Sequence, residues 1–264
     1  MIGAIAGDIA GSIYEFHPQK REDIPLFTKN SFYTDDSVMT IAAAEALLQQ
    51  SSYQEAYLKY GHLYPHAGYG GMFRKWLASD QPMPYNSFGN GSAMRVSAVG
   101  WAFDTIDEVL AEAKKSALPT HNHPEGIKGA QATALAILFA RQGMKKEEIR
   151  DAITERFAYD LNRTVDSIRP GYQFNETCQE TVPEALIAFF DASDYEDTLR
   201  KAISLGGDAD TLACIAGSVA EAYYAGVPQS MVEEVVRCLP PDLLEVVEQF
   251  RSRYLQVIYP ESLP

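Results

Sequence analysis

Apolar residues recur at helical spacing through most of the 264-residue chain, and the period-two alternation of half-buried strands is almost absent. Residues that end helices agree with this pattern, since Gly143 follows one apolar stretch and Gly226 with Pro228 follows another. The pattern predicts helices at 36–50, 53–63, 92–100, 104–117, 125–142, 146–156, 181–190, 194–204, 209–225, 229–237 and 241–258. We therefore expect an all-α fold rather than an α/β fold.

Three glycines, Gly3, Gly7 and Gly11, recur every four residues in the first segment and would form a stripe without side chains on one helix face. Each glycine disfavours a helix by roughly 1 kcal/mol relative to alanine, so three in register call for a packing reason. We expect another backbone to approach this face closely and the helix to be central. No repeat, low-complexity tract or linker divides the chain, so we expect one compact domain over residues 1–264.

The charge balance argues against one class of partner. The chain has 22 lysines and arginines against 36 aspartates and glutamates, a formal net charge of −14. The basic pairs Lys20-Arg21 and Lys145-Lys146 are each followed by two acids, so neither forms a basic patch. General affinity for nucleic acid or for anionic lipid is therefore not expected.

Other features of the sequence concern location. The first apolar run has no basic residue ahead of it and stops at Asp8, unlike a secretory signal. No stretch approaches the roughly 18 apolar residues of a membrane span. Cys178, Cys214 and Cys238 are odd in number and widely spaced, which fits neither a disulfide framework nor a thiolate zinc site. We expect a cytoplasmic protein without a membrane partner.

The motif Asp208-Ala209-Asp210-Thr211 follows two glycines and opens a long apolar helix. Carboxylates and a hydroxyl within one turn are hard oxygen ligands, suited to Mg²⁺ or Mn²⁺ and poorly suited to zinc. The alternative is an aspartate N-cap with a second acid in the first turn, which the helix dipole favours without a metal. Taken alone, this motif favours the cap.

The motif Thr34-Asp35-Asp36-Ser37 has the same form and also opens an apolar helix. Adjacent acids repel each other, and one aspartate is enough to cap a helix. A second acidic run of this kind is better explained by a cation than by two coincident caps. Together the two motifs offer four carboxylates and two hydroxyls, about what a dinuclear oxygen site completed by water requires.

Three further segments contain candidate site residues. Glu15 ends the glycine-striped segment, where it is either a ligand, a water-orienting group or base, or a surface glutamate at a helix end. Gly89-Asn90-Gly91-Ser92 precedes an apolar helix and is either a phosphate-binding loop or an Asn-Gly turn with Ser92 as N-cap. His121 and His123 stand before a Pro124 helix start, and such histidines more often make hydrogen bonds than bind metal. No nucleophile elbow appears and no cysteine has a base near it in sequence, so covalent catalysis is not supported.

Taken together, five motifs resemble the ADP-ribosylglycohydrolase family, which includes the dinitrogenase reductase-activating glycohydrolase. They occur in the family's order between residue 1 and about residue 225. They are Gly7-Asp8-x-x-Gly11-Ser12-x-x-Glu15, Thr34-Asp35-Asp36-Ser37, Gly89-Asn90-Gly91-Ser92-Ala93-Met94-Arg95, Thr120-His121-Asn122-His123 and Gly207-Asp208-Ala209-Asp210-Thr211. The resemblance implies an all-α enzyme that removes ADP-ribose from a modified protein, nucleic acid or small molecule, using two Mg²⁺ or Mn²⁺ ions.

Site roles follow from the same resemblance. It implies metal ligands at Thr34, Asp35, Asp36, Asp208, Asp210 and Thr211. It implies catalytic roles for Glu15, Asp35 and Asp36, and substrate contacts from Tyr69, Gly70, Gly89, Asn90, Gly91, Ser92, His121 and Tyr172. Among these, Gly89 to Ser92 would hold the diphosphate or the distal ribose, His121 would contact phosphate, the Tyr69 loop would cover the distal ribose and Tyr172 would pack on adenine. The metals would bind the vicinal hydroxyls of that ribose, and a water on a metal or oriented by Glu15 would attack C1″.

One departure concerns the acceptor that ADP-ribose leaves. Arginine-specific members of the family have a further aspartate between the first metal motif and the glycine-rich motif, and here the segment 65–73 contains no acid. Serine-linked, nucleic-acid-linked and small-molecule substrates therefore stay open beside arginine. Two other classes also stay open: a dinuclear-metal phosphoesterase acting on a nucleotide-like substrate, and a module that binds ADP-ribose without hydrolysis.

Overall fold

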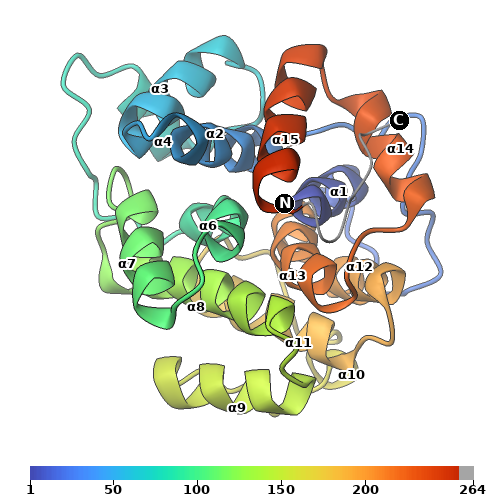
Figure 1. Cartoon of the computed structure of the whole chain (residues 1–264). Coiled ribbons are helices and arrows are strands. Elements are labelled where there is room, and N and C mark those ends of the chain that lie inside the picture. The colour runs from blue at the N-terminus through green and yellow to red at the C-terminus, as the bar shows by residue number, and fades with distance from the viewer. Residues whose placement is uncertain (256–264) are drawn as a thin grey trace.

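The computed structural model describes residues 1–255, and within them it contains fifteen helices and no strand (Figure 1). An isolated bridge pairs Gly89 with Thr177. The helices are α1 (Ile2–Gly11), α2 (Asp35–Gln49), α3 (Tyr53–Leu63), α4 (Gly71–Leu77), α5 (Gly91–Met94), α6 (Ser97–Ala102), α7 (Ile106–Ala117), α8 (Pro124–Arg141), α9 (Lys146–Phe157), α10 (Val165–Ile168), α11 (Cys178–Asp191), α12 (Tyr195–Ser204), α13 (Ala209–Tyr223), α14 (Gln229–Cys238) and α15 (Pro241–Tyr254). The all-α prediction is confirmed. None of these helices is long and apolar enough to cross a membrane.

Several predicted boundaries were wrong. The segment 92–100 is not one helix but two short ones, α5 and α6, separated at Arg95 and Val96. The helix predicted at 181–190 begins three residues earlier, at Cys178, and continues through Pro183. The last helix ends at Tyr254, and positions 256–258 of that prediction lie outside the described residues. The short helices α4 and α10 were not predicted, since seven and four residues are too few for a clear period.

The glycine stripe of α1 packs directly on the backbone of α13. A methyl group added at Gly3 would lie 2.4 Å from the carbonyl oxygen of Gly217, and one at Gly7 would lie 2.1 Å from that of Ala213. One at Gly11 would lie 2.4 Å from the Cα of Asp210. The predicted close approach is therefore confirmed, and all ten residues of α1 are buried. This contact brings the start of the chain against the helix that begins with the second acidic motif.

Helix α8 is the second central element. Its residues 132–140 are all buried, as expected for a helix surrounded by others rather than lying at a surface. It packs against α6, α7, α11 and α13, and Figure 1 shows it running below α6. The segments 85–90 and 120–123 lead directly into α5 and α8, and these two helices pack against each other.

Candidate functional site

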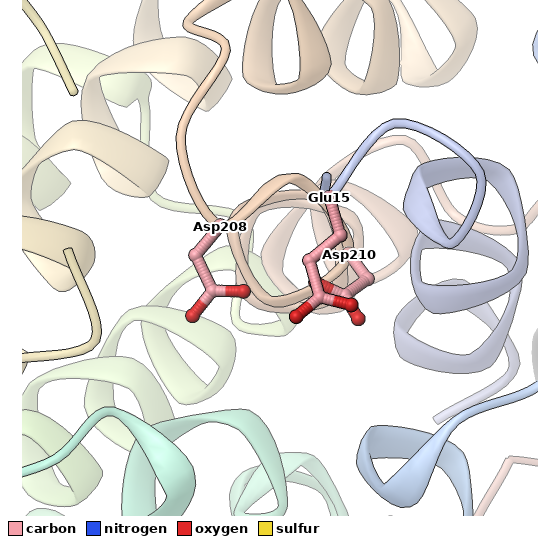
Figure 2. Close-up of side chains that lie close together, drawn as sticks. All are labelled: Glu15, Asp208 and Asp210. Atoms are coloured by element: carbon pink, nitrogen blue, oxygen red, sulfur yellow. The ribbon is translucent and has the colours of Figure 1, made fainter. Parts of the chain in front are cut away.

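Three carboxylates meet where the loop after α1 approaches the start of α13. Glu15, Asp208 and Asp210 each offer an oxygen within 4.8 Å of the others, as Figure 2 shows. Both aspartates are buried, and Glu15 is partly exposed. Within residues 1–255 none of the three forms an ion pair with a lysine or an arginine. Buried carboxylates at this spacing without a basic partner fit a divalent cation.

Asp208 occupies the N-cap position of α13 but does not cap it. Its side chain makes no capping hydrogen bond; instead its Oδ2 accepts from Nδ2 of Asn90 over 2.7 Å. Asp210 Oδ1 accepts the amide of Thr211 over 2.9 Å, which fixes the second carboxylate at the helix start. The capping alternative is therefore wrong for Asp208, and its carboxylate is turned toward the other acids.

In the first acidic motif the threonine and the two aspartates have different roles. Thr34 is the N-cap of α2, and its hydroxyl accepts from the amide of Asp36 over 3.2 Å. An aspartate cap is therefore wrong for α2, and the carboxylates of Asp35 and Asp36 have no capping role. Oδ2 of Asp36 is buried and has no hydrogen-bond partner among residues 1–255. A buried carboxylate oxygen left unpaired is costly, and a cation would satisfy it.

Asp8 organises this motif and was not predicted as a site residue. Its carboxylate accepts from the amide and the hydroxyl of Thr34, at 2.9 and 2.7 Å. It also accepts from the amide of Ser37 at 3.1 Å and from the Ser37 hydroxyl. The available signals were a single acid inside the glycine-striped helix and its position in the first of the five family motifs. Asp8 joins α1 to the turn that begins α2.

Asp35 and Asp36 do not belong to the group of three carboxylates in the described part of the chain. They lie on α2, which packs against α13. Burial and then the charge of Asp210 raise the pKa of both well above the usual range. Burial also raises the pKa of Asp208 to about 6. Burial, followed by Asp210 and Glu176, raises the pKa of Glu15 to about 8. Burial is the largest cause of each shift, and neighbouring carboxylates add to it, so the charged forms of these acids are disfavoured without a cation.

The glycine-rich loop is tied to its surroundings by backbone and side-chain bonds. The amide of Gly89 donates to Ser87 Oγ at 3.1 Å, and that of Asn90 donates to the Glu176 carbonyl at 2.7 Å. Ser92 lies inside α5, and its hydroxyl donates to the Gly126 carbonyl at 2.7 Å. The Ser92 N-cap alternative is therefore wrong, and this hydroxyl faces α8. Substrate contacts from Gly89, Gly91 and Ser92 stay a prediction.

The two histidines have separate roles. His123 is the N-cap of α8, and its Nδ1 accepts the amide of Glu125 at 3.1 Å. His121 is buried, and its Nδ1 lies 2.7 Å from the Thr120 hydroxyl. Burial and the charge of Arg95 lower the pKa of His121 well below its usual range, so the ring is neutral. Neither histidine joins a metal-type cluster within residues 1–255.

The remaining predicted contacts lie on two sides of the acids. Tyr69 is buried, its hydroxyl has no partner within the described residues, and its ring packs on Phe73 with centroids 5.2 Å apart. Just before it, Gly68 approaches Asp35, since a methyl group there would lie 3.4 Å from Oδ1. Gly70 is the N-cap of α4 and has open space beside it.

Tyr172 lies against the second acidic motif. A methyl group at Gly207 would lie 2.3 Å from the Tyr172 ring, and the hydroxyl donates to the Glu180 carbonyl at 2.9 Å. The side chain is only 9% exposed. The ring thus supports the bend before Asp208, and a contact with adenine stays a prediction.

Comparisons with known proteins agree with the motifs. A family model described as ADP-ribosylglycohydrolase matches residues 1–260. A human relative, ADP-ribosylhydrolase ARH3, is 28% identical over 87% of this chain and 86% of its own. ADP-ribosylarginine hydrolase Tri1 of Pseudomonas putida (strain GB-1) is 23% identical over 89% of this chain and 72% of its own.

A solved structure gives the same result for the fold. The chain is similar to a structure titled "ADP-ribosylglycohydrolase-related protein complex", with a TM-score of 0.69 at 24% identity over 97% of this chain and 95% of that one. The similarity in fold is consistent with the family model, which matches residues 1–260. The chain belongs to the ADP-ribosylglycohydrolase family.

Proposed function

We propose that this protein is a metal-dependent ADP-ribosylhydrolase that cleaves the glycosidic bond at C1″ of ADP-ribose and releases ADP-ribose from a modified protein, nucleic acid or small molecule. The observation that carries the proposal is the gathering of acids from both ends of the chain without a basic partner in residues 1–255. These acids are Glu15, Asp35, Asp36, Asp208 and Asp210. The family match and the names of the two relatives support the reaction class.

The donor set favours two Mg²⁺ or Mn²⁺ ions, with Thr34, Asp35, Asp36, Asp208, Asp210 and Thr211 as ligands. Every donor is a carboxylate or hydroxyl oxygen, and no histidine or cysteine joins the cluster in the described residues. The unpartnered Oδ2 of Asp36 and the upward pKa shifts of the acids support the fit. When bound, the cations supply positive charge that stabilises the ribose oxygens as the glycosidic bond breaks.

The protein's own groups account for water activation and substrate positioning. Glu15 comes from a different segment than Asp208 and Asp210, and its partial exposure lets it reach a water molecule. In the proposed reaction its carboxylate orients that water and accepts its proton as the water oxygen bonds to C1″ and the bond from C1″ to the acceptor breaks. The proton then passes to the leaving acceptor atom, so that the products are ADP-ribose and the protonated acceptor. Asn90 orients Asp208, while the Gly89 to Ser92 loop and His121 bind the diphosphate. The Tyr69-Gly70 loop covers the distal ribose, and Tyr172 supports the adenine end.

The acceptor is the least determined part of the substrate. The segment 65–73 lacks the acid of the arginine-specific members, although one of the relatives is named an arginine hydrolase. We therefore propose an ADP-ribosyl substrate without assigning arginine, serine, nucleotide or small-molecule linkage. The free thiols of Cys178, Cys214 and Cys238 are consistent with the proposed cytoplasmic location.

The experiment is a product assay on arginine-, serine- and nucleotide-linked ADP-ribose with Mg²⁺ and then with EDTA. We expect release of free ADP-ribose from at least one linkage and its loss with EDTA. Glu15→Gln is expected to lower kcat by at least about 100-fold, with Glu55→Gln, at an exposed glutamate of α3, as matched control. Release of AMP would instead favour a phosphoesterase. Metal-dependent binding of ADP-ribose without turnover of any linkage would favour a binding module.

A further inference from the structure

Arg95 is a buried cation without a carboxylate partner in the described residues. The side chain is 1% exposed, and its guanidinium carbon lies 4.1 Å from the centroid of the Tyr57 ring. Its Nη2 donates to Thr120 Oγ1 at 2.8 Å and to the Ser116 carbonyl at 3.3 Å, and its Nε has no partner in the described part of the chain. A buried charge is costly and usually has an ionic partner. Arg95 instead donates to the neutral hydroxyl of Thr120.

That hydroxyl connects Arg95 to His121. Thr120 is fully buried, and its Oγ1 lies 2.7 Å from Nδ1 of His121. Because a guanidinium can only donate, the Thr120 oxygen accepts from Arg95 and its own proton is available to Nδ1. When Thr120 donates this proton to Nδ1, that nitrogen is the acceptor, and the hydrogen of the neutral imidazole is on Nε2.

The Nε2 edge of His121 faces the glycine-rich loop. A methyl group on Gly91 would lie 3.4 Å from Nε2, and one on Gly89 would lie 3.6 Å from it. Since both residues are glycines, no side chain separates this nitrogen from the loop. An Nε2–H at this position can donate to an oxygen bound there, whereas the other tautomer would present a lone pair and repel an anionic oxygen.

We propose that Arg95 and Thr120 are positioning residues that fix His121 as an Nε2–H donor aimed at an anionic phosphate oxygen held at the Gly89 to Gly91 loop. The identity of the ligand, the diphosphate of an ADP-ribosyl group, rests on the proposed function. The tautomer of the His121 ring does not depend on the proposed function. Arg95 and Thr120 are not expected to touch the substrate, since both are buried behind His121.

The first test is spectroscopic and needs no substrate. Long-range ¹H–¹⁵N correlation of the histidine rings in the full chain should show His121 with the hydrogen on Nε2. Thr120→Val should abolish this preference and Thr120→Ser should keep it. Thr133→Val is the matched control, because Thr133 is also fully buried and its hydroxyl has no partner. An Nδ1–H tautomer in the wild type, or an unchanged His121 signal in Thr120→Val, would overturn the proposal.

The second test measures ADP-ribose affinity by calorimetry with Mg²⁺ present. Loss of one oriented hydrogen bond should weaken binding about tenfold in Thr120→Val and leave Thr120→Ser within about threefold of wild type. In a His121→Ala background, Thr120→Val should cause no further loss, because Thr120 acts through His121. Arg95→Met should repeat the effect of Thr120→Val if it folds, and the threonine variants are sufficient if it does not.

The outcomes separate this proposal from the proposed function. Turnover of an ADP-ribosyl substrate with unchanged affinity in Thr120→Val would overturn the positioning role and leave the function standing. A loss in Thr120→Val that adds fully to that of His121→Ala would overturn it too. A tautomer that depends on Thr120, in a protein that releases no ADP-ribose from any linkage, would support the positioning role while the proposed function fails.

Discussion

Asn90 Nδ2 donates to Asp208 Oδ2 over 2.7 Å, and this bond links two motifs that are 118 positions apart in the chain. The same nitrogen donates to Thr181 Oγ1 at 3.1 Å, while the backbone amide of Asn90 is held by the Glu176 carbonyl at 2.7 Å. The asparagine is thus fixed from two sides before it contacts the carboxylate. It orients Asp208 as a partner of a metal ligand would.

Asn90→Ala should therefore weaken Mg²⁺ binding by about 10- to 100-fold while the fold is kept, since partners of metal ligands typically have effects of this size. Calorimetric titration of the EDTA-treated protein with Mg²⁺ measures the change. Asn162→Ala, at an exposed asparagine, is the control and should bind as the wild type does. Equal affinity in the two variants would show that Asp208 needs no such partner.

Asp8 is expected to contribute more to stability than an ordinary aspartate. The Asp8 carboxylate accepts from two amides and two hydroxyls. Asparagine offers only one acceptor oxygen, so in Asp8→Asn its NH2 group would face some of these donors. We expect the free energy of unfolding to fall by on the order of 2–3 kcal/mol, measured in urea with Mg²⁺ present to offset repulsion among the acids. The exposed Asp23→Asn serves as comparison. A stability within about 0.5 kcal/mol of wild type would refute this role for Asp8.

The metal-free protein should lose stability as the pH rises. In the folded chain the pKa of Asp208 is raised from 3.8 to about 6 and that of Glu15 from 4.5 to about 8, mainly by burial. A carboxyl with a raised folded pKa stabilises the fold below its unfolded pKa and loses this contribution as the pH passes the folded value. With EDTA the melting temperature should therefore fall between pH 4 and pH 8, the window that these values set. Saturating Mg²⁺ should reduce the slope, and a metal-free melting temperature that rises across this window would contradict the assignment.

The contact between α1 and α13 leaves no room for a side chain. In Gly7→Ala the new methyl group would meet the Ala213 carbonyl at 2.1 Å, so one backbone must shift. We expect a loss of about 1–3 kcal/mol in the free energy of unfolding, together with weaker Mg²⁺ binding because α13 begins with Asp208 and Asp210. Gly171→Ala, where nothing lies within 4 Å, should be nearly neutral. Similar stabilities for the two variants in a denaturant titration would argue against the packing role of the stripe.

The sequence predicted the fold class because helical periodicity is a local signal, and the glycine stripe indicated a helix contact without naming the partner. It did not separate α5 from α6, where the buried side chain of Arg95 lies at the break. That side chain makes contacts with Tyr57, Ser116 and Thr120 that only the folded structure brings together.

The candidate site was also predictable from the sequence only in part. The acid-rich motifs were visible because two such runs are unusual, but local sequence could not separate a cap from a ligand. The structure assigns the cap of α2 to Thr34 and no cap bond to Asp208. Asp8 was missed because its partners Thr34 and Ser37 are 26 and 29 positions away. Its role depends on the close approach of two helices rather than on its neighbours in the chain.

The central claim is that the acid cluster binds the divalent cations on which hydrolysis depends. The most direct measurement is calorimetric titration of the EDTA-treated wild type and of Asp210→Asn with Mg²⁺, each followed by an ADP-ribose release assay, with the exposed Asp80→Asn as control. We expect wild type and Asp80→Asn to bind Mg²⁺ and release ADP-ribose, and Asp210→Asn to lose both while keeping its helical circular dichroism. ADP-ribose release by the wild type in EDTA, without measurable Mg²⁺ or Mn²⁺ binding, would contradict the account.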